Sequence, residues 1–291
     1  MTNSTDPGLL IIDKPAGLTS HQVVARVRRV FGTKKVGHAG TLDPMATGVL
    51  IVGLNRATRL LGHLALHDKA YSATIRLGAS TTTDDAEGET LATADASGLG
   101  TAAITDAIVP LRGVIRQRPS AVSAIKVDGK RAYARVRAGE DVQLPAREVT
   151  VSRFDVLATR VVAGFTDVDV AVECSSGTYV RALARDLGIA LGVGGHLTAL
   201  RRTRIGRYTL DQATELCSLT SASPLMTMAE AARLSFPVVE VDAAAAKDVS
   251  FGRALAIEVP AEVTGIVGPS GDLLALYRPD AEGARPIAVL I

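Results

Sequence analysis

The chain has 291 residues, of which 47% are hydrophobic and 21% are charged, so it holds enough apolar material to fold into about two domains. Its formal net charge is only +2 at pH 7, and this near balance does not by itself point to a nucleic acid partner. No apolar run reaches the ~18 residues that cross a bilayer, and no basic segment precedes the short run Leu9–Ile12, so we expect a globular, cytoplasmic protein without a membrane partner.

The two cysteines, Cys174 and Cys217, stand far apart, without a CxxC pair or a neighbouring pair of histidines. We expect half-buried thiols, with neither a disulfide framework nor a zinc site. The sequence also lacks a P-loop, a GxGxxG turn between a strand and a helix, and any cluster of metal ligands. These patterns do not point to a metal site or to a bound nucleotide.

The first third of the chain predicts a strand, a helix, a second strand and a second helix. Leu9–Ile12 is apolar enough for a buried strand, and Thr19-Ser20 is typical of a cap before a helix with valines on one face and Gly32 at its end. Val49–Val52 predicts another buried strand. Asn55 is expected to cap the next helix.

The middle of the chain predicts more strands than helices. Alternating apolar and polar residues indicate half-buried strands at Tyr71–Leu77, Arg147–Leu157 and Phe165–Val172. Thr81–Glu89 is a polar, acidic loop, and Thr178–Leu187 predicts a helix that Gly188 ends. Because strand–helix–strand alternations are few, we expect an α+β fold with a mainly antiparallel sheet and flanking helices, not a doubly wound nucleotide-binding fold.

A domain boundary is expected near Ser218–Pro224, where serine, alanine and proline accumulate. We therefore divide the chain into a catalytic domain, 1–222, and a C-terminal part, 223–291. That part begins with a helix-like segment, Met226–Leu234. Strand-like segments follow at Pro237–Val241, Leu273–Tyr277 and Pro286–Ile291, so we expect a small β-rich module.

One segment, residues 116–147, is locally basic. Its cations are Arg116, Arg118, Lys126, Lys130, Arg131, Arg135, Arg137 and Arg147, against the acids Asp128, Glu140 and Asp141. Turn residues at Pro119-Ser120 and Asp128-Gly129, and the helix-like run Lys130–Arg135, predict a strand, a turn and a short helix that project from the body. The charge alone fits a solvated face or an RNA-binding arm equally well.

The stretch Gly37–Leu50 places a single carboxylate, Asp43, in a glycine-rich turn just before the strand at 49–52. Glycines allow backbone angles that other residues avoid, and Pro44 biases Asp43 toward an extended conformation. The residues alone leave two interpretations open. Asp43 is a held, reactive carboxylate, or Asp-Pro only starts a turn and His38 is incidental.

Four segments together resemble the TruB family of tRNA pseudouridine synthases. Residues 37–44 resemble the family's G-H-x-G-x-L-D-P signature, and Leu10–Ser20 resembles its opening motif. Asp68–Tyr71 resembles its lysine-x-tyrosine element, and Cys174–Arg181 followed by Leu197–Arg202 resembles its last motif. The four occur in the family's order and reach from the first strand to about residue 205.

The resemblance implies the pseudouridine synthase fold with a C-terminal module similar to a PUA domain. It implies isomerisation of uridine to pseudouridine in the T-loop of tRNA, at nucleotide 55 in tRNA numbering. The base must leave the RNA stack to be reached, and no cofactor is needed. The expected partner is the T-arm of tRNA, bound by a monomer that needs no other protein.

For the reaction itself the resemblance implies three residues. Asp43 corresponds to the catalytic aspartate, whose attack on the sugar, attack on the base and participation in a glycal route all remain open. Arg181 corresponds to the arginine that pairs with this aspartate and keeps it ionised in a water-poor pocket. Tyr71 corresponds to the ring that stacks on uracil. Without the resemblance, an exposed helix arginine and a core tyrosine would be adequate interpretations.

Further residues are implied to bind or support the substrate. His38 is expected to fill the gap that the extruded base leaves, and Tyr179 and Leu200 are expected to line the pocket. Lys14 is expected to support the loop that carries Asp43. On the basic segment we expect contacts to phosphates from Lys126, Arg131 and Arg137.

Two other functions compete with this one. A non-catalytic RNA-binding or tRNA-folding module would use the same surface without needing Asp43. A guide-RNA-dependent synthase would need partner proteins, and the compact basic segment at 116–147 argues against it.

Overall fold

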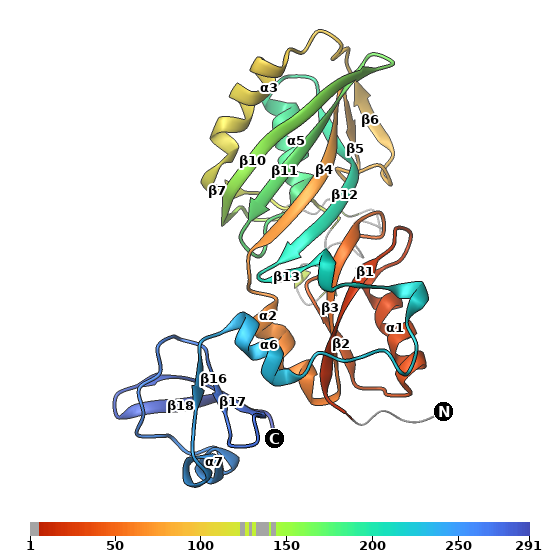
Figure 1. Cartoon of the computed structure of the whole chain (residues 1–291). Coiled ribbons are helices and arrows are strands. Elements are labelled where there is room, and N and C mark those ends of the chain that lie inside the picture. Colours follow the sequence, from red (N-terminus) through yellow and green to blue (C-terminus); the bar gives the residue numbers. More distant parts are fainter. Residues whose placement is uncertain (1–5, 123–125, 128–129, 132–139, 141–143) are drawn as a thin grey trace. The chain divides into compact units, whose positions relative to one another are not determined.

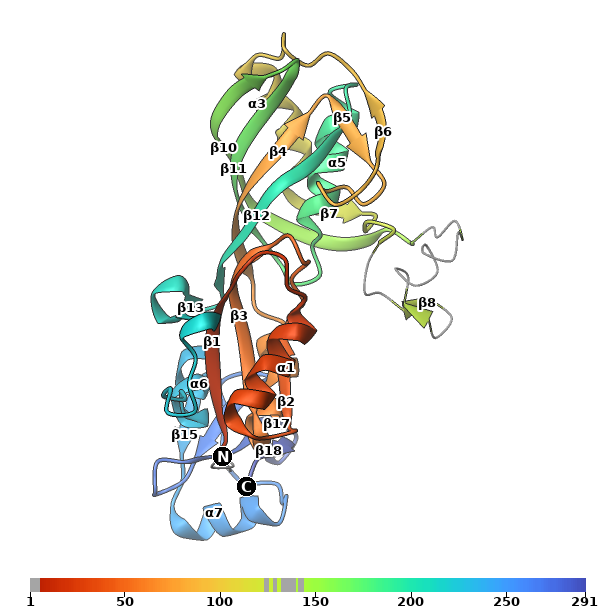
Figure 2. The ribbon, with the colours of Figure 1, turned by 90° about the vertical axis from the view of Figure 1, so that its right-hand side faces the viewer.

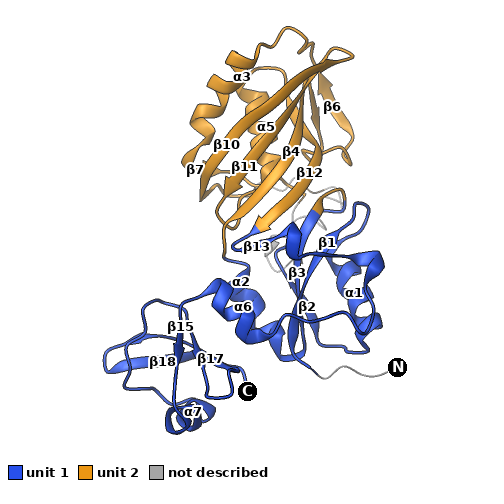
Figure 3. Ribbon diagram, in the orientation of Figure 1, with its two compact units in different colours: residues 1–44, 48–66, 205–291 blue, residues 45–47, 67–204 orange. Residues whose placement is uncertain are grey.

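We analysed a computed structural model that describes residues 6–122, 126–127, 130–131, 140 and 144–291. The chain groups into two compact units, coloured separately in Figure 3. Unit 1 comprises residues 1–44, 48–66 and 205–291, and unit 2 comprises residues 45–47 and 67–204. None of the helices in the described part of the chain is long and apolar enough to span a membrane.

The N-terminal part of unit 1 is built around strands β1 (Gly8–Lys14), β2 (Val36–Ala39) and β3 (Thr47–Leu54). Both β1 and β2 pair antiparallel with β3, and the short strand β14 (Thr214–Glu215) adds to β1 in parallel. Strand β3 is buried almost throughout, as its continuous apolar run predicted. The expected strands in this region are confirmed.

Helix α1 (Ser20–Phe31) begins and ends where the sequence predicted. The Thr19 hydroxyl accepts a hydrogen bond from the backbone N–H of Gln22, whose side chain accepts one from the backbone N–H of Thr19. Gly32 follows the helix with φ of 65°, a left-handed conformation in which glycine carries no steric cost. Of the four valines predicted on one face, Val23, Val24 and Val27 are buried, and Val30, near the end of the helix, is half-buried.

The prediction that Asn55 caps a helix was wrong. Asn55 is itself the first residue of a 3-10 helix (Asn55–Leu60), which leads into the single turn α2 (Leu61–Leu64), and its φ is 53°. Its amide nitrogen donates to the carbonyl of Asp6, and its amide oxygen accepts from the Thr33 hydroxyl. The side chain therefore ties two distant segments to this corner and is not available to the helix N–H groups.

The C-terminal part of unit 1 is rich in strands, as expected. It contains β13 (Tyr208–Thr209), α6 (Met228–Ser235), β15 (Val238–Glu240), α7 (Ala243–Ser250), β16 (Thr264–Val267), β17 (Leu273–Asp280) and β18 (Gly283–Val289). The last four strands form a sheet in the order β15-β16-β17-β18 (Figure 1). One apolar cluster joins Leu9 and Ile11 of β1 to Val267 and Leu276 of this sheet, so both parts of unit 1 share a core. The boundary at 222/223 stays a prediction.

Unit 2 is a strongly bent sheet with two helices on one face (Figures 1 and 2). Its strands run in the order β12-β4-β11-β10-β7, with bounds Gly195–Ile205, Lys69–Leu77, Phe165–Cys174, Arg147–Val162 and Gly113–Gln117. The pairs β4–β11, β10–β11 and β7–β10 are antiparallel. Helices α3 (Thr101–Ile108) and α5 (Val180–Ala190) contact each other and the sheet. A hairpin of β5 (Ala79–Thr81) and β6 (Thr90–Thr93) flanks the acidic loop between them. The α+β prediction with a mainly antiparallel sheet is confirmed.

Gly188 does not end the helix that begins near Thr178, contrary to the prediction. Helix α5 runs through it to Ala190. A Cβ at Gly188 would lie 2.1 Å from the backbone nitrogen of Gly195, so only glycine lets the helix and the start of β12 approach this closely. Gly188 marks a packing contact between backbones, which the local sequence does not distinguish from a helix stop.

Several arginines of unit 2 are engaged within the protein. Strand arginines pair with acids of the same or the adjacent strand, as Arg76 with Asp167, Arg153 with Asp155 and Arg160 with Asp169. Arg204 of β12 pairs with Asp68, in the loop that precedes β4, and with Glu173 of β11, two strands away. Such partly exposed pairs contribute little stability each. They do show that the preference for arginine over lysine in this chain is not by itself a sign of phosphate binding.

Candidate functional site

The loop that carries Asp43 is held from its N-terminal side by the first helix. Ser20, the first residue of α1 and only 1% exposed, donates its hydroxyl to the carbonyl of Leu42 at 3.1 Å. The same hydroxyl accepts a hydrogen bond from the backbone N–H of Leu42 at 2.9 Å. Both backbone groups of the residue before Asp43 are therefore bound, while the Asp43 side chain itself is only half-buried.

The loop is held on its C-terminal side by the turn that follows β1. The carbonyl of Pro44 accepts from the backbone N–H of Gly17 at 2.9 Å and from Lys14 Nζ at 3.2 Å. Lys14 is fully buried, and its ammonium also donates to two carbonyls in the turn 15–18. A buried ammonium needs such partners to offset its lost hydration. Hydrogen bonds thus join the opening motif, residues 10–20, to the loop that carries Asp43.

His38 lies on strand β2, not in the loop where its sequence position placed it. Its register partner on β3 is Val52, and its half-buried ring meets the ring of His21 edge to face, with 5.4 Å between centroids. The pairing of β2 with β3 fixes the side to which this imidazole points. The backbone of His38 is thus held in a sheet, and its expected role in filling the gap left by an extruded base stays a prediction.

Arg181, the second residue of α5, is not the exposed helix arginine that the bare sequence would allow. It is 4% exposed, and its guanidinium donates to the carbonyl of Thr83 at 2.8 Å and to that of Val122 at 3.0 Å. Its Nε lies 3.5 Å from a carboxylate oxygen of Asp85. The planar fork is thereby restricted in orientation, which suits a residue that must present one edge to a substrate or a carboxylate.

Asp85 was missed by the sequence analysis. It is 3% exposed, and its other carboxylate oxygen accepts from the Thr83 hydroxyl at 2.5 Å and from the backbone N–H of Glu87 at 3.1 Å. One helical turn beyond Arg181, Arg185 pairs with Asp84 at 3.2 Å. The available signal was the adjacent acids in the polar loop 81–89 together with two arginines four residues apart on the predicted helix.

Tyr179 stands just before α5 and is held by the two strands that flank the basic segment. The Gln117 side chain accepts from the backbone N–H of Tyr179 at 2.8 Å and donates to its carbonyl at 3.0 Å. The Arg147 guanidinium lies 5.1 Å from the centre of the Tyr179 ring and donates to the carbonyl of Gly177. Gln117 and Arg147 are register partners on β7 and β10, so the base of the basic segment also positions Tyr179.

Tyr71 and Leu200, the remaining predicted pocket residues, are on strands of unit 2. Tyr71 lies on β4 opposite Val172 and is 8% exposed, and Leu200 lies on β12 and is 7% exposed. Their burial is equally consistent with a core role, so burial does not distinguish the two interpretations.

The structure describes only part of the basic segment. Lys126 lies on β8 (Lys126–Val127) and Arg131 on β9 (Lys130–Arg131), where the two residues are register partners in a short hairpin. The helix expected from Lys130 is therefore wrong for residues 130–131. Its remainder, and with it Arg137, lies outside the described residues.

The predicted site residues fall into two sets. Unit 1 carries Lys14, His38 and Asp43, with Lys14 bound to the carbonyl of Pro44 next to Asp43, and unit 2 carries Tyr71, Tyr179, Arg181 and Leu200. The pairing of Asp43 with Arg181 stays a prediction.

Lys69, in the lysine-x-tyrosine element, is buried opposite Cys174 in the β4–β11 register. Its ammonium donates to the carbonyl of His67 at 2.7 Å. Burial, followed by the nearby charge of Arg202, lowers the pKa of Lys69 to about 8. Burial raises the pKa of Cys174 to about 11, so this thiol stays protonated at neutral pH. Because Cys174 is buried and Cys217 is exposed, the expectation of half-buried thiols was wrong.

The depressed pKa of Lys69 predicts a pH dependence of stability. Below about pH 8 the lysine is protonated in both states, so the folded chain bears the full cost of its burial. Between about 8 and 10.5 only the unfolded chain keeps the proton, and this cost disappears as pH rises. The free energy of unfolding of Lys69→Met, relative to wild type, should therefore be higher at pH 7 than at pH 10.5 by about 3 kcal/mol. Urea unfolding at both pH values measures this, and the exposed Lys34→Met should show no such difference.

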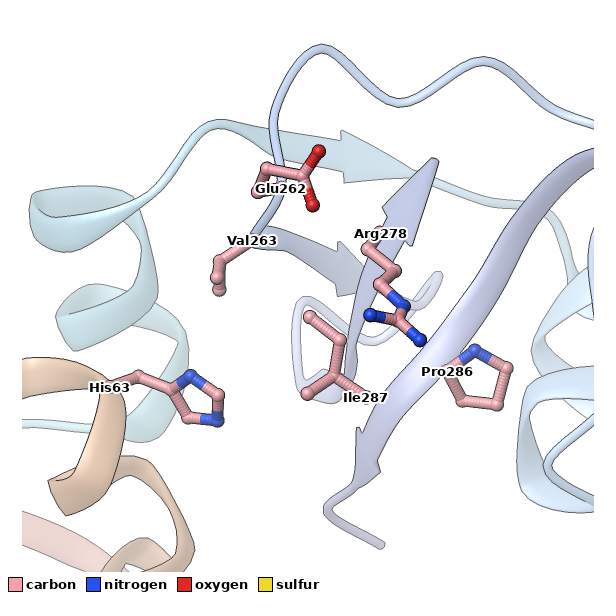
Figure 4. Close-up of a pocket in the computed structure, with 6 residues that line it drawn as sticks. All are labelled: His63, Glu262, Val263, Arg278, Pro286 and Ile287. Carbon is pink, nitrogen blue, oxygen red and sulfur yellow. The ribbon is translucent and has the colours of Figure 1, made fainter. Parts of the chain in front are cut away.

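A separate hollow of about 470 Å³ lies in unit 1 (Figure 4). It is lined by His63, Glu262, Val263, Arg278, Pro286 and Ile287. His63 of α2 faces the side chains of Arg278 and Ile287, and burial lowers the pKa of His63. No predicted site residue lines this hollow. Among the residues that the structure describes, no three histidine, cysteine, aspartate or glutamate side chains group as a metal site.

The geometry around Asp43 can be compared with known families. A family model described as the N-terminal domain of TruB family pseudouridylate synthases matches residues 28–180. The chain belongs to the TruB family. Two further models, described as C-terminal domains of tRNA pseudouridine synthase II and of tRNA pseudouridylate synthase B, match residues 236–291 and 181–244. This TruB-family chain is therefore an enzyme, an isomerase that forms pseudouridine.

Relatives match over nearly their whole length. A tRNA pseudouridine synthase B of Cutibacterium acnes is 62% identical over 294 residues, covering 99% of this chain and 100% of the relative. The protein of the same name from Nocardia farcinica is 57% identical, covering 99% and 95%. The match is thus not confined to the motifs of the TruB family but includes the C-terminal sheet.

Solved structures share the TruB-family fold. A chain of the crystal structure of a Cbf5-Nop10-Gar1 complex superposes with a TM-score of 0.75 at 26% identity, covering 98% of this chain and 85% of that one. A chain of an H/ACA RNP bound to a substrate RNA containing 2'-deoxyuridine gives 0.74 at 25% identity, with the same coverage. The predicted pseudouridine synthase fold is confirmed.

Proposed function

We propose that this enzyme converts uridine to pseudouridine in the T-loop of tRNA, at nucleotide 55, with Asp43 as the catalytic carboxylate and without a guide RNA. The observation that carries the proposal is the loop of Asp43, whose neighbours on both sides are bound by buried groups of the opening motif. The relatives named tRNA pseudouridine synthase B support tRNA as the substrate.

The reaction requires a carboxylate in a fixed position and a pocket that holds the uracil base. The bond between the sugar C1' and the base N1 breaks, the base turns while it is held, and C1' bonds to C5 of the base. C5 then loses its proton and N1 gains one, so that the product is an isomer of the substrate. Asp43 acts as the nucleophile or as the base that removes a proton. The reaction is an isomerisation, so it needs neither an oxidant or reductant nor the hydrolysis of a nucleotide.

The remaining site residues are assigned to the carboxylate or to the substrate. Arg181, restricted by Thr83, Val122 and Asp85, presents a cation to the reacting carboxylate. Tyr71 stacks on the uracil ring, and Tyr179 and Leu200 line the pocket. Because a stacked base cannot reach such a site, the nucleotide is extruded at a cost of a few kcal/mol, and His38 occupies the space it leaves.

We further propose that residues 1–222 form the catalytic part and that 223–291 form a linker helix and a PUA-like module. The segment 116–147 binds RNA, and the enzyme acts as a monomer. The compact length of segment 116–147 supports action without partner proteins. The Cbf5 chain, by contrast, was solved in a complex with Nop10 and Gar1.

The deciding experiment incubates the purified chain alone with unmodified tRNA transcript and maps pseudouridine by chemical sequencing. Product at the T-loop uridine supports the proposal, and product at another uridine overturns the assigned position. No product from a folded, tRNA-binding chain would favour a guide-dependent enzyme. An isolated T-arm hairpin, used as a second substrate, tests whether the arm is sufficient.

The assignment of phosphate contacts predicts a change in salt dependence. If Lys126, Arg131 and Arg137 bind phosphates, each substitution by alanine should reduce the slope of log affinity against log salt by about one unit, because one fewer counterion is released. Filter binding with inactive enzyme at several salt concentrations measures the slope. Arg160→Ala is the control, since Arg160 is paired with Asp169, and its slope should match wild type. An unchanged slope removes the substituted residue from the interface.

A further inference from the structure

The start of α1 contains two neighbouring hydroxyls with different partners. Thr19 is the N-cap, and its hydroxyl accepts from the backbone N–H of Gln22 within the helix. The hydroxyl of Ser20 turns to a segment 22 residues away, where it binds the N–H and the carbonyl of Leu42. The helix is capped without Ser20, so the Ser20 contacts serve the Asp43 loop and not the helix.

The geometry of the Ser20 contacts restricts the backbone next to Asp43. A hydroxyl that donates to the carbonyl and accepts from the N–H of one residue fixes the peptide planes on both sides of that residue. One of these planes is the Leu42–Asp43 peptide. The Leu42 side chain is itself 4% exposed and anchors the same point from the core. On the other side of Asp43, Pro44 has its own fixed φ and a bound carbonyl.

We propose that Ser20 is a positioning residue for the carboxylate of Asp43, and this inference rests on the proposed catalytic role of Asp43. Ser20 does not touch the substrate. It determines where the Asp43 Cα stands and how its side chain leaves the backbone. A displacement of about 1 Å at a reacting group is enough to slow chemistry about a hundred-fold, so a buried pair of hydrogen bonds next to that group has a large effect on rate.

The test removes each hydroxyl separately. Ser20→Ala should lower the single-turnover rate about a hundred-fold while the affinity for tRNA stays within about threefold of wild type, because the binding surface is unchanged. Thr19→Ala is the matched control at the adjacent position. It should lower the Tm by a few degrees and leave the single-turnover rate within about twofold of wild type. Both variants are assayed well below their Tm, with folding checked by circular dichroism.

Two further variants separate the possible failures. Ser20→Thr keeps the hydroxyl and should recover the rate to within about fivefold of wild type, whereas a loss caused by general loosening of the fold would follow Tm and not the hydroxyl. Asp43→Asn is assayed beside it. If Asp43→Asn is active, the proposed function fails. If Asp43→Asn is inactive and Ser20→Ala is as fast as Thr19→Ala, only the role of Ser20 is overturned. A folded Ser20→Thr that stays as slow as Ser20→Ala overturns it as well.

Discussion

Asp43→Asn should abolish pseudouridine formation and leave tRNA binding intact. The amide keeps the size and the hydrogen-bonding shape of the carboxylate but is neither a good nucleophile nor a base, so the rate should fall at least about a thousand-fold. Asp43 is half-buried, and the backbone groups of Leu42 and Pro44 that hold its loop are untouched by this substitution, so the structural change should be small. Affinity should stay within about threefold of wild type, because the proposed RNA-binding surface is the basic segment, which the substitution does not change.

The measurement pairs a product assay with a binding assay on the same preparation. Single-turnover conversion of tRNA at saturating enzyme reports the chemistry, and filter binding reports the affinity. Asp13→Asn, a change to another acid of unit 1, is the control and should leave the rate near wild type. Conversion by Asp43→Asn at a rate close to wild type would falsify the catalytic assignment. A rival non-catalytic RNA-binding function predicts that no role of the protein depends on Asp43.

Arg181→Ala should both destabilise the protein and abolish activity, and a second substitution should separate these effects. Removing the guanidinium leaves the Asp85 carboxylate, which is 3% exposed, without its cation at 3.5 Å. Breaking a buried ion pair from one side costs about 3–5 kcal/mol, because a buried charge is left uncompensated. The free energy of unfolding should therefore drop by this amount.

The double variant Arg181→Ala with Asp85→Asn should recover most of that stability, because no buried charge is left. The asparagine oxygen can still accept from the Thr83 hydroxyl and from the N–H of Glu87. Activity should remain absent, because the cation assigned to Asp43 is still missing. Urea unfolding and single-turnover rates on the same variants give both quantities. Recovery of activity in the double variant would show that Arg181 serves only to neutralise Asp85.

Arg185→Ala provides the matched control for Arg181. It lies one turn further along α5 and pairs with the adjacent acid of the same loop, Asp84, but both side chains are more exposed. We expect a loss of about 1 kcal/mol or less and nearly normal activity. A large loss of activity in Arg185→Ala would mean that the helix as a whole, and not the guanidinium of Arg181, is what the reaction requires.

The sequence by itself determined much of the local structure and singled out Asp43 as the proposed reactive group. The caps of α1 at Thr19 and Gly32, the apolar run of β3 and the alternation along β4 depend on residues within a few positions of one another, so they could be predicted without the fold. The motif around Asp43 is also contiguous. Its resemblance to the TruB family therefore pointed to the carboxylate and to pseudouridine formation.

Only the tertiary structure decided which groups hold these residues. The contacts of Ser20 with Leu42 span 22 residues, and that of Arg181 with Thr83 spans 98. A hydroxyl in a helix start or an aspartate in a polar loop has many possible partners, and local pattern does not choose among them. Gly188 and Asn55 were misread for the same reason, because distant backbone at Gly195 and distant residues Asp6 and Thr33 determine what each does. Packing between remote segments selects one partner by shape and burial, and that selection exists only in the folded chain.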